Sequence, residues 1–175
     1  MRTVVYVGTS LDGYIAKQDG DIDWIAKFAD ETVNKAYEKF ISGIDAIVMG
    51  RNTFEKVMEF PEWAYPKHVF VISNTLKEIP ASLQGKASIV SMEPKPMLDY
   101  LSAQGHSNIY VDGGKLIQSF LKEDLISEMI ISTAPVLLGG GIPLFGMMDH
   151  SLEFHLTNTE VFANGLVSNF YSRSK

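Results

Sequence analysis

Short continuous apolar runs alternate with segments of helical apolar spacing as far as residue 123. The first run, 3–9, is nearly continuous in β-branched and aromatic residues, which predicts a strand buried on both faces. In 30–42 apolar residues recur at i, i+3, i+4, i+7 and i+8, which predicts an amphipathic helix that Asp30 can cap at its start and Gly43 at its end. Further strands are predicted at 46–49, 69–72, 88–90 and 109–111, with helices after 53, over 96–104 and after 114.

This alternation changes after Glu123. Segments 129–134, 154–161 and 166–172 are predicted as strands with no helix between them, and an antiparallel edge or C-terminal hairpin is the simplest arrangement. The pattern predicts an α/β fold of three layers, with a mostly parallel central sheet, helices on both faces and an antiparallel C-terminal hairpin.

Composition limits the possible classes of protein. At roughly 100 to 200 residues per domain, the 175 residues predict a single domain over 1–175. The absence of cysteine excludes thiolate nucleophiles and Cys-based metal sites. The net charge of −6, with scattered basic residues, argues against nucleic-acid binding. No signal peptide or membrane span is evident, so we expect a cytoplasmic protein that acts on a small molecule.

Two predicted strand-to-helix turns could hold an anion, because the carboxyl ends of parallel strands and the starts of helices present backbone N–H groups. One contains Gly50, Arg51 and Thr53, and the other contains Gly113 and Gly114. Either pair alone is more often a simple tight turn. If the two strands are neighbours, the turns would form one extended phosphate cradle.

Two further loops have a structural and a functional interpretation. In the loop after the first strand, Asp12 is the only obvious ionisable group, although Asp12-Gly13 is also an ordinary turn signal. In the segment 137–145, three successive glycines either allow a ligand to approach the backbone or simply join two strands. The four histidines show no metal-ligand spacing, and we expect no metal site.

Four motifs in this order resemble the dihydrofolate-reductase-like superfamily. The resemblance is closest to the branch that contains the C-terminal reductase domain of bacterial riboflavin biosynthesis. The motifs span nearly the whole chain and are SLDGYIA at 10–16, DAIVMGRNTFE at 45–55, YVDGG at 110–114, and PVLLG at 135–139 with PLF at 143–145.

The resemblance implies NADPH bound across the sheet. It places Gly50, Arg51 and Thr53 on the cofactor phosphates and the pair Gly113 and Gly114 under the pyrophosphate. It also implies that Ser73 helps to hold the 2′-phosphate, and that the backbone of Ile15 and Ala16 contacts the nicotinamide carboxamide. The riboflavin branch further implies a homodimer, for which the apolar segment 129–138 offers a surface.

Folate reductases carry a carboxylate on the helix after the first loop, which assists protonation of the substrate. This chain differs from them at that position. Counting back from the Gly-Arg-x-Thr motif places Asn34 there, and an amide cannot supply a proton. Asp12 and Glu38 remain the candidates for a catalytic acid, while Trp24 and Asn34 are candidates for substrate contact, with Trp24 equally interpretable as a packing residue. The sequence predicts an NADPH-dependent reductase of a small heterocyclic or carbonyl-type substrate. The alternative is a nucleotide-binding module without turnover.

Overall fold

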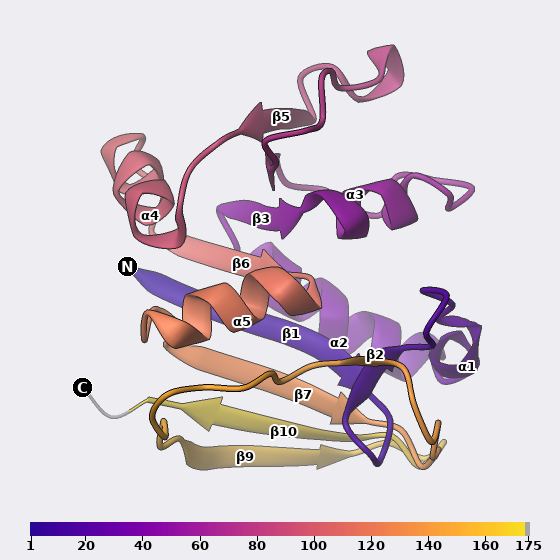
Figure 1. Cartoon of the computed structure of the whole chain (residues 1–175). Coiled ribbons are helices and arrows are strands. Elements are labelled where there is room, and N and C mark those ends of the chain that lie inside the picture. Colours follow the sequence, from indigo (N-terminus) through magenta and orange to yellow (C-terminus); the bar gives the residue numbers. More distant parts are fainter. Residues whose placement is uncertain (174–175) are drawn as a thin grey trace.

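The chain forms a large eight-stranded sheet with the strand order β5-β4-β3-β6-β1-β7-β10-β9 (Figure 1). The computed structural model describes residues 1–173. The strands of this sheet are β1 (Arg2–Thr9), β3 (Ala46–Gly50), β4 (Val69–Ile72), β5 (Ala87–Val90), β6 (Asn108–Asp112), β7 (Glu128–Thr133), β9 (His155–Val161) and β10 (Val167–Ser172). The helices are α1 (Asp23–Ala26), α2 (Glu31–Ser42), α3 (Arg51–Val57), α4 (Pro94–Ala103) and α5 (Gly114–Lys122), with a 3₁₀ turn at Ala81–Leu83.

Parallel pairing extends through most of the sheet. The strands from β5 to β7 in the spatial order are parallel neighbours, whereas β10 is antiparallel to both β7 and β9. The predicted fold class and the C-terminal hairpin are therefore confirmed. The strand β7 belongs to the parallel part, because α5 is the crossover that carries the chain from β6 past β1 to β7.

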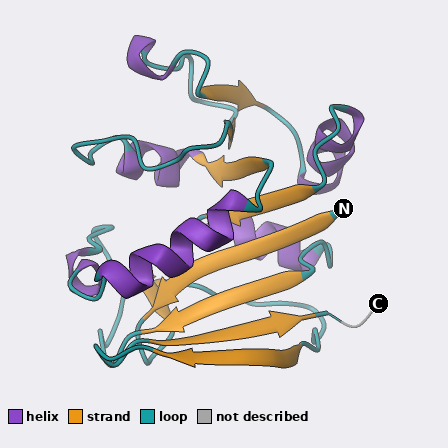
Figure 2. Ribbon diagram, turned by 180° about the vertical axis from the view of Figure 1, so that it is seen from behind, coloured by secondary structure: helices purple, strands orange, loops and turns teal. Residues whose placement is uncertain are grey.

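Helices cover both faces of the sheet. In Figure 1 α5 lies in front of the strands and α2 behind them, and the reverse view in Figure 2 brings α2 to the front. On one face, buried residues of α4 and α5 such as Leu101 and Phe120 pack against Val48 and Val111 of the sheet. On the other face, α2 and α3 pack against residues such as Met49, Val71 and Tyr110. Alternate residues of one strand thus enter two different cores.

The loop predicted after the first strand contains two short elements. The strand β2 (Tyr14–Ala16) pairs antiparallel with β8 (Ile142–Pro143), and α1 follows it. Two- and three-residue strands are too short for a periodicity to mark them. Within residues 1–173, no helix is long and apolar enough to cross a membrane.

Candidate functional site

The two glycine turns lie next to each other at the carboxyl edge of the sheet. The strands β3 and β6 are parallel neighbours, with Met49 paired to Asp112. A side chain on Gly113 would overlap Thr53 Oγ1 in the first turn of α3. The starts of α3 and α5 therefore meet at one point, as expected if they form a single cradle.

Gly113 stands at the N-cap of α5 with a φ of +97°, a backbone conformation that other residues rarely adopt. It has no side chain to accept from the first turn of the helix, whose N–H groups lack intrahelical partners. Such a helix start favours an anion through its free donors and its dipole. The N-terminal end of this nine-residue helix therefore lies where the two turns meet.

The ribbon of β2 and β8 packs over the start of α5. A Cβ on Gly114 would lie 2.8 Å from Ile15 Cδ1 and 3.5 Å from the carbonyl oxygen of Pro143. A Cβ on Gly141 would overlap the carbonyl oxygen of Ala16. The glycines of both loops therefore allow segments to approach closely, and the side chain of Ile15 lies against Gly114 while the backbone of Ala16 lies against Gly141.

A hollow of about 240 Å³ lies at the ends of β4 and β5, beside α5. Its walls include Ile72, Asn74, Ser91, Leu116 and Ser119. The neighbouring Ser73 Oγ accepts hydrogen bonds from the backbone N–H groups of Thr75 (3.1 Å) and Leu76 (2.9 Å). Its own O–H can still donate to a ligand oxygen.

Arg51 begins α3 with an exposed guanidinium. Its Nε lies 3.8 Å from Glu55 Oε1, and its Nη2 lies 3.4 Å from Asn52 Oδ1. Exposed ion pairs of this length contribute little to stability. The Arg51 guanidinium can therefore exchange these contacts for a phosphate with little loss of stability.

Asp12 anchors a loop. Its carboxylate accepts hydrogen bonds from Ser10 Oγ (2.6 Å), from the N–H of Leu138 (3.1 Å) and from the N–H of Gly139 (2.7 Å). The hydrogen bond from Ser10, followed by the two backbone donors, lowers the pKa of Asp12 below its usual value. An acid whose pKa is lowered holds its proton poorly, so Asp12 is better suited to positioning the glycine loop than to donating a proton.

The other predicted catalytic and substrate residues lie apart from the cradle. Glu38 and Asn34 are exposed on α2, while Tyr37 and Phe40 of the same helix turn toward the sheet. Trp24 is 8% exposed and packs with Phe28 and residues of the β9–β10 region. The packing interpretation of Trp24 is the one that matches its surroundings. Within residues 1–173, no group of three or more potential metal ligands occurs.

A group that sequence reasoning missed is the carboxyl of Asp112, which precedes the glycine pair. The hydroxyl of Tyr65 donates a hydrogen bond to Asp112 Oδ2. Burial raises the pKa of Asp112 above its usual value, against the opposing effect of the hydrogen bonds from Tyr65 and from the N–H of Gly113. Asp112 is therefore the acid of this site that best retains a proton.

Tyrosines surround this carboxyl on the face that α2 and α3 cover. The Tyr110 hydroxyl donates to the carbonyl oxygen of Tyr6 (2.9 Å), and the rings of Tyr6 and Tyr37 meet edge to face at 5.5 Å. Burial raises the pKa of Tyr6, Tyr37, Tyr65 and Tyr110, so all four hydroxyls keep their protons. The spacing of Tyr110 and Asp112 in one strand could have indicated that they share a face.

Comparisons with known proteins agree with this architecture. Residues 3–168 match the family described as RibD C-terminal domain. The "Uncharacterized protein YwjB" of Bacillus subtilis (strain 168) is 36% identical over 169 residues, which cover 94% of each chain. A crystal structure named "Putative riboflavin biosynthesis protein", from Shewanella sp. PV-4, covers 100% of both chains with a TM-score of 0.94 and 41% identity.

A more distant structure shares the fold alone. It is a diaminohydroxyphosphoribosylaminopyrimidine deaminase/5-amino-6-(5-phosphoribosylamino)uracil reductase from Thermotoga maritima, with a TM-score of 0.78 and 15% identity. The alignment covers 99% of this chain and 56% of that one. The matches confirm the branch of the superfamily that the four sequence motifs indicate.

Proposed function

Since the chain belongs to the RibD C-terminal domain family, we propose that it is an NADPH-dependent reductase that transfers hydride to a small heterocyclic substrate of pyrimidine or pterin type. The observation that carries the proposal is that the two glycine turns meet at the start of α5, while Leu116 and Ser119 of the same helix line a hollow of about 240 Å³ at the ends of β4 and β5. The family match supports the reductase role and the pyrimidine-like substrate.

The residues of the cradle fit a dinucleotide phosphate. Thr53 and the backbone at Gly113 and Gly114 would hold the pyrophosphate, while Arg51 and Ser73 would hold the 2′-phosphate. The hollow beside Asn74 and Ser91 would take the adenosine end. The backbone of Ile15 and Ala16, in the strand whose Ile15 side chain lies against Gly114, would contact the nicotinamide carboxamide.

NADPH, when bound, supplies the hydride, and the chain must supply the proton. Asp112 directly precedes the cradle, and burial favours its protonated form. Its carboxyl would donate that proton to the substrate atom next to the carbon that receives the hydride. Tyr65 holds the carboxyl in place through its hydroxyl.

A bulky side chain placed in the hollow of about 240 Å³ tests directly whether the cofactor binds there. Ser119 lines it, whereas Lys122 lies one turn further along α5, exposed and outside it. We expect Ser119→Phe to weaken NADPH binding at least tenfold, about 1.4 kcal/mol, and Lys122→Phe to leave it unchanged. NADPH affinity is measured by titration, and oxidation is followed by nicotinamide absorbance with pyrimidine and pterin substrates. Equal affinity of both variants would contradict the placement of the cofactor.

The alternative, a nucleotide-binding module without turnover, keeps the cradle and lacks a proton donor. It is favoured by Asn34, an exposed amide where folate reductases carry their acid. The same titration separates the two functions. NADPH binding without oxidation in the presence of any tested substrate would support the module.

We also propose that the protein is a homodimer, through a different surface from the one first expected. The first half of segment 129–138 is interior, because β7 lies between β1 and β10 and Met129 and Ile130 are buried, whereas Leu137 is 71% exposed. The edge strand is β9, whose Leu156 and Val161 are 59% and 74% exposed. An apolar edge of this kind is suited to isologous contact with a second copy. Light scattering at micromolar concentration should give twice the monomer mass, and Val161→Lys should reduce it.

A further inference from the structure

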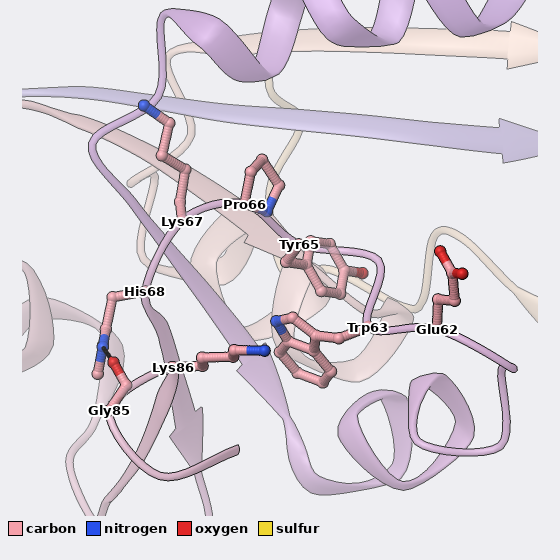
Figure 3. A pocket seen from close by; sticks show the side chains of 8 residues that line it. All are labelled: Glu62, Trp63, Tyr65, Pro66, Lys67, His68, Gly85 and Lys86. Atoms are coloured by element: carbon pink, nitrogen blue, oxygen red, sulfur yellow. Dashed lines mark hydrogen bonds between the residues drawn. The ribbon is translucent and has the colours of Figure 1, made fainter. Parts of the chain in front are cut away.

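A second hollow, of about 520 Å³, opens where β4 and β5 begin (Figure 3). His68 and Lys86, which line it, directly precede these two strands. The nucleotide cradle lies at the opposite, carboxyl ends of the same strands. The two hollows are therefore separate places on the molecule, although Tyr65 lines this hollow with its ring and bonds Asp112 with its hydroxyl.

The charge of this hollow is opposite to that of the whole chain. The chain carries 21 acidic residues against 15 lysines and arginines, whereas the hollow is lined by Lys67, His68 and Lys86 and by a single acid, Glu62. Among the described residues, neither Lys67 nor Lys86 has a carboxylate within ion-pair distance, unlike Lys35. The hollow therefore presents ammonium groups that the protein itself does not neutralise.

Trp63, in the wall of this hollow, has a hydrogen-bond donor that lacks an acceptor. The indole Nε1 of Trp63 is buried and has no hydrogen-bond partner among residues 1–173, which is also true of Trp24, but only Trp63 lines this hollow. An indole N–H can only donate, so its partner must be an acceptor brought by a ligand or by solvent. In Figure 3 the side chain of Lys86 points toward Trp63, whereas the carboxylate of Glu62 and the ammonium of Lys67 point away from that pair.

The backbone of Lys86 is held in a hydrogen-bonded turn. The N–H of Lys86 donates to the carbonyl oxygen of Leu83 (2.9 Å), and the carbonyl oxygen of Lys86 accepts from the N–H of Val69 (2.9 Å). The ring of His68 braces the same turn, with Nδ1 3.2 Å from the carbonyl oxygen of Gly85 and Nε2 3.0 Å from Ser88 Oγ.

The indole is fixed as well. The Trp63 ring packs edge to face against Phe54 at 5.9 Å and Tyr65 at 5.6 Å. The indole held in this way loses little conformational freedom when a ligand binds.

We propose that this hollow binds the oxyanion of a small organic phosphate or carboxylate, with Lys86 Nζ and the Trp63 indole N–H as its donors. A charge-assisted hydrogen bond from an ammonium to an oxyanion is among the stronger kinds available to a protein. The volume leaves room beside the oxyanion for an apolar body, which would lie against Trp63 and Pro66. Lys67, at the rim, adds long-range attraction for a negative charge.

The indole proton provides a readout that does not involve turnover or NADPH. The chain has two tryptophans, so its proton–nitrogen NMR spectrum contains two indole signals, and Trp63→Phe assigns them. Phenyl phosphate and benzoate are titrated separately, with sodium chloride at matched ionic strength as the control. We expect a saturable shift of the Trp63 signal, while the signal of the buried Trp24 does not move.

Matched charge variants decide whether Lys86 is the donor. We expect Lys86→Gln to weaken the binding at least tenfold, whereas Lys122→Gln, which removes an exposed lysine of α5, leaves it unchanged. A shift with only one probe would still support the site and would identify its oxyanion as a phosphate or a carboxylate. No saturable shift with either probe, or equal affinity of Lys86→Gln and the unmodified protein, would overturn the proposal.

Discussion

The two glycine turns of the cradle both lead from a buried strand into a helix, but their glycines do different things. Gly50 has an extended backbone, with φ −80° and ψ 161°, and a Cβ there would meet nothing within 4 Å. Gly113 has a φ of +97°, and a Cβ there would overlap Thr53 Oγ1. Only the second turn requires glycine for its own conformation and packing.

The charged residues of the two turns also differ in how tightly their surroundings hold them. The first turn carries Arg51, which is exposed and loosely paired with Glu55. The second turn carries Asp112, which is enclosed by tyrosines and bonded by Tyr65. Under the proposed function this difference would divide the work, with the exposed cation holding the end of the cofactor and the enclosed acid serving the reaction.

The largest effect is expected at Asp112. Asp112→Asn keeps the shape and removes the transferable proton, so turnover should fall by on the order of 10²- to 10⁴-fold while NADPH affinity stays unchanged. Steady-state oxidation of NADPH measures the first quantity and a binding titration the second. Asp99→Asn, on an exposed position of α4, is the control. Full turnover by Asp112→Asn would show that the acid lies elsewhere.

The next effect concerns Arg51 and the choice of cofactor. A charge-assisted bond contributes about 1.5 to 3 kcal/mol, so Arg51→Ala should weaken NADPH about 10- to 150-fold. NADH, which lacks the 2′-phosphate, should lose much less. Titration of both cofactors against both proteins checks this. Equal losses would place Arg51 on the pyrophosphate, and no loss would assign it to the ion pair with Glu55.

The glycines themselves should differ in stability. We expect Gly113→Ala to lower the free energy of unfolding by about 1 to 3 kcal/mol, because it combines an unfavourable φ with an overlap. Gly50→Ala should change it by less than about 0.5 kcal/mol. Denaturant unfolding measures both. Thr53→Ala should restore part of the loss in the Gly113→Ala background, since it removes the overlapping Oγ1. Equal losses at Gly50 and Gly113 would remove the distinction between the turns.

The smallest effect is a pH dependence that contrasts Asp112 with Asp12. The pKa of Asp112 is raised in the folded protein, so its contribution to stability is present below the unfolded value near 3.8 and is lost as pH rises through the folded pKa. The pKa of Asp12 is lowered, so its contribution is present above 3.8 and is lost as pH falls through the folded pKa. Relative to the unmodified protein, Asp112→Asn should gain stability as pH rises, and the deficit of Asp12→Asn should shrink as pH falls. Parallel curves would contradict the opposite environments of these acids.

Most of the fold could be predicted from local pattern. The helix predicted at 30–42 is observed as α2, with Asp30 Oδ1 accepting from the N–H groups of Thr32 and Val33 and Gly43 at its end. The strand predicted at 69–72 is observed with the same bounds. In each case apolar spacing and a capping residue lie within one segment. The pairing of β2 with β8 could not be predicted, because it joins segments far apart in the chain and involves too few residues to form a pattern.

The sequence by itself determined an α/β sheet and two glycine turns at strand ends, since these depend on residues close together in the chain. Only the tertiary structure decided what the two Asp-Gly pairs do. Asp12 meets N–H groups from 138 and 139, and Asp112 meets the hydroxyl of Tyr65, 47 positions away. A carboxyl's pKa depends on the burial and the donors around it, and strand register and loop packing bring those from distant parts of the chain. The same dipeptide therefore becomes a loop anchor in one place and an enclosed acid with a raised pKa in the other.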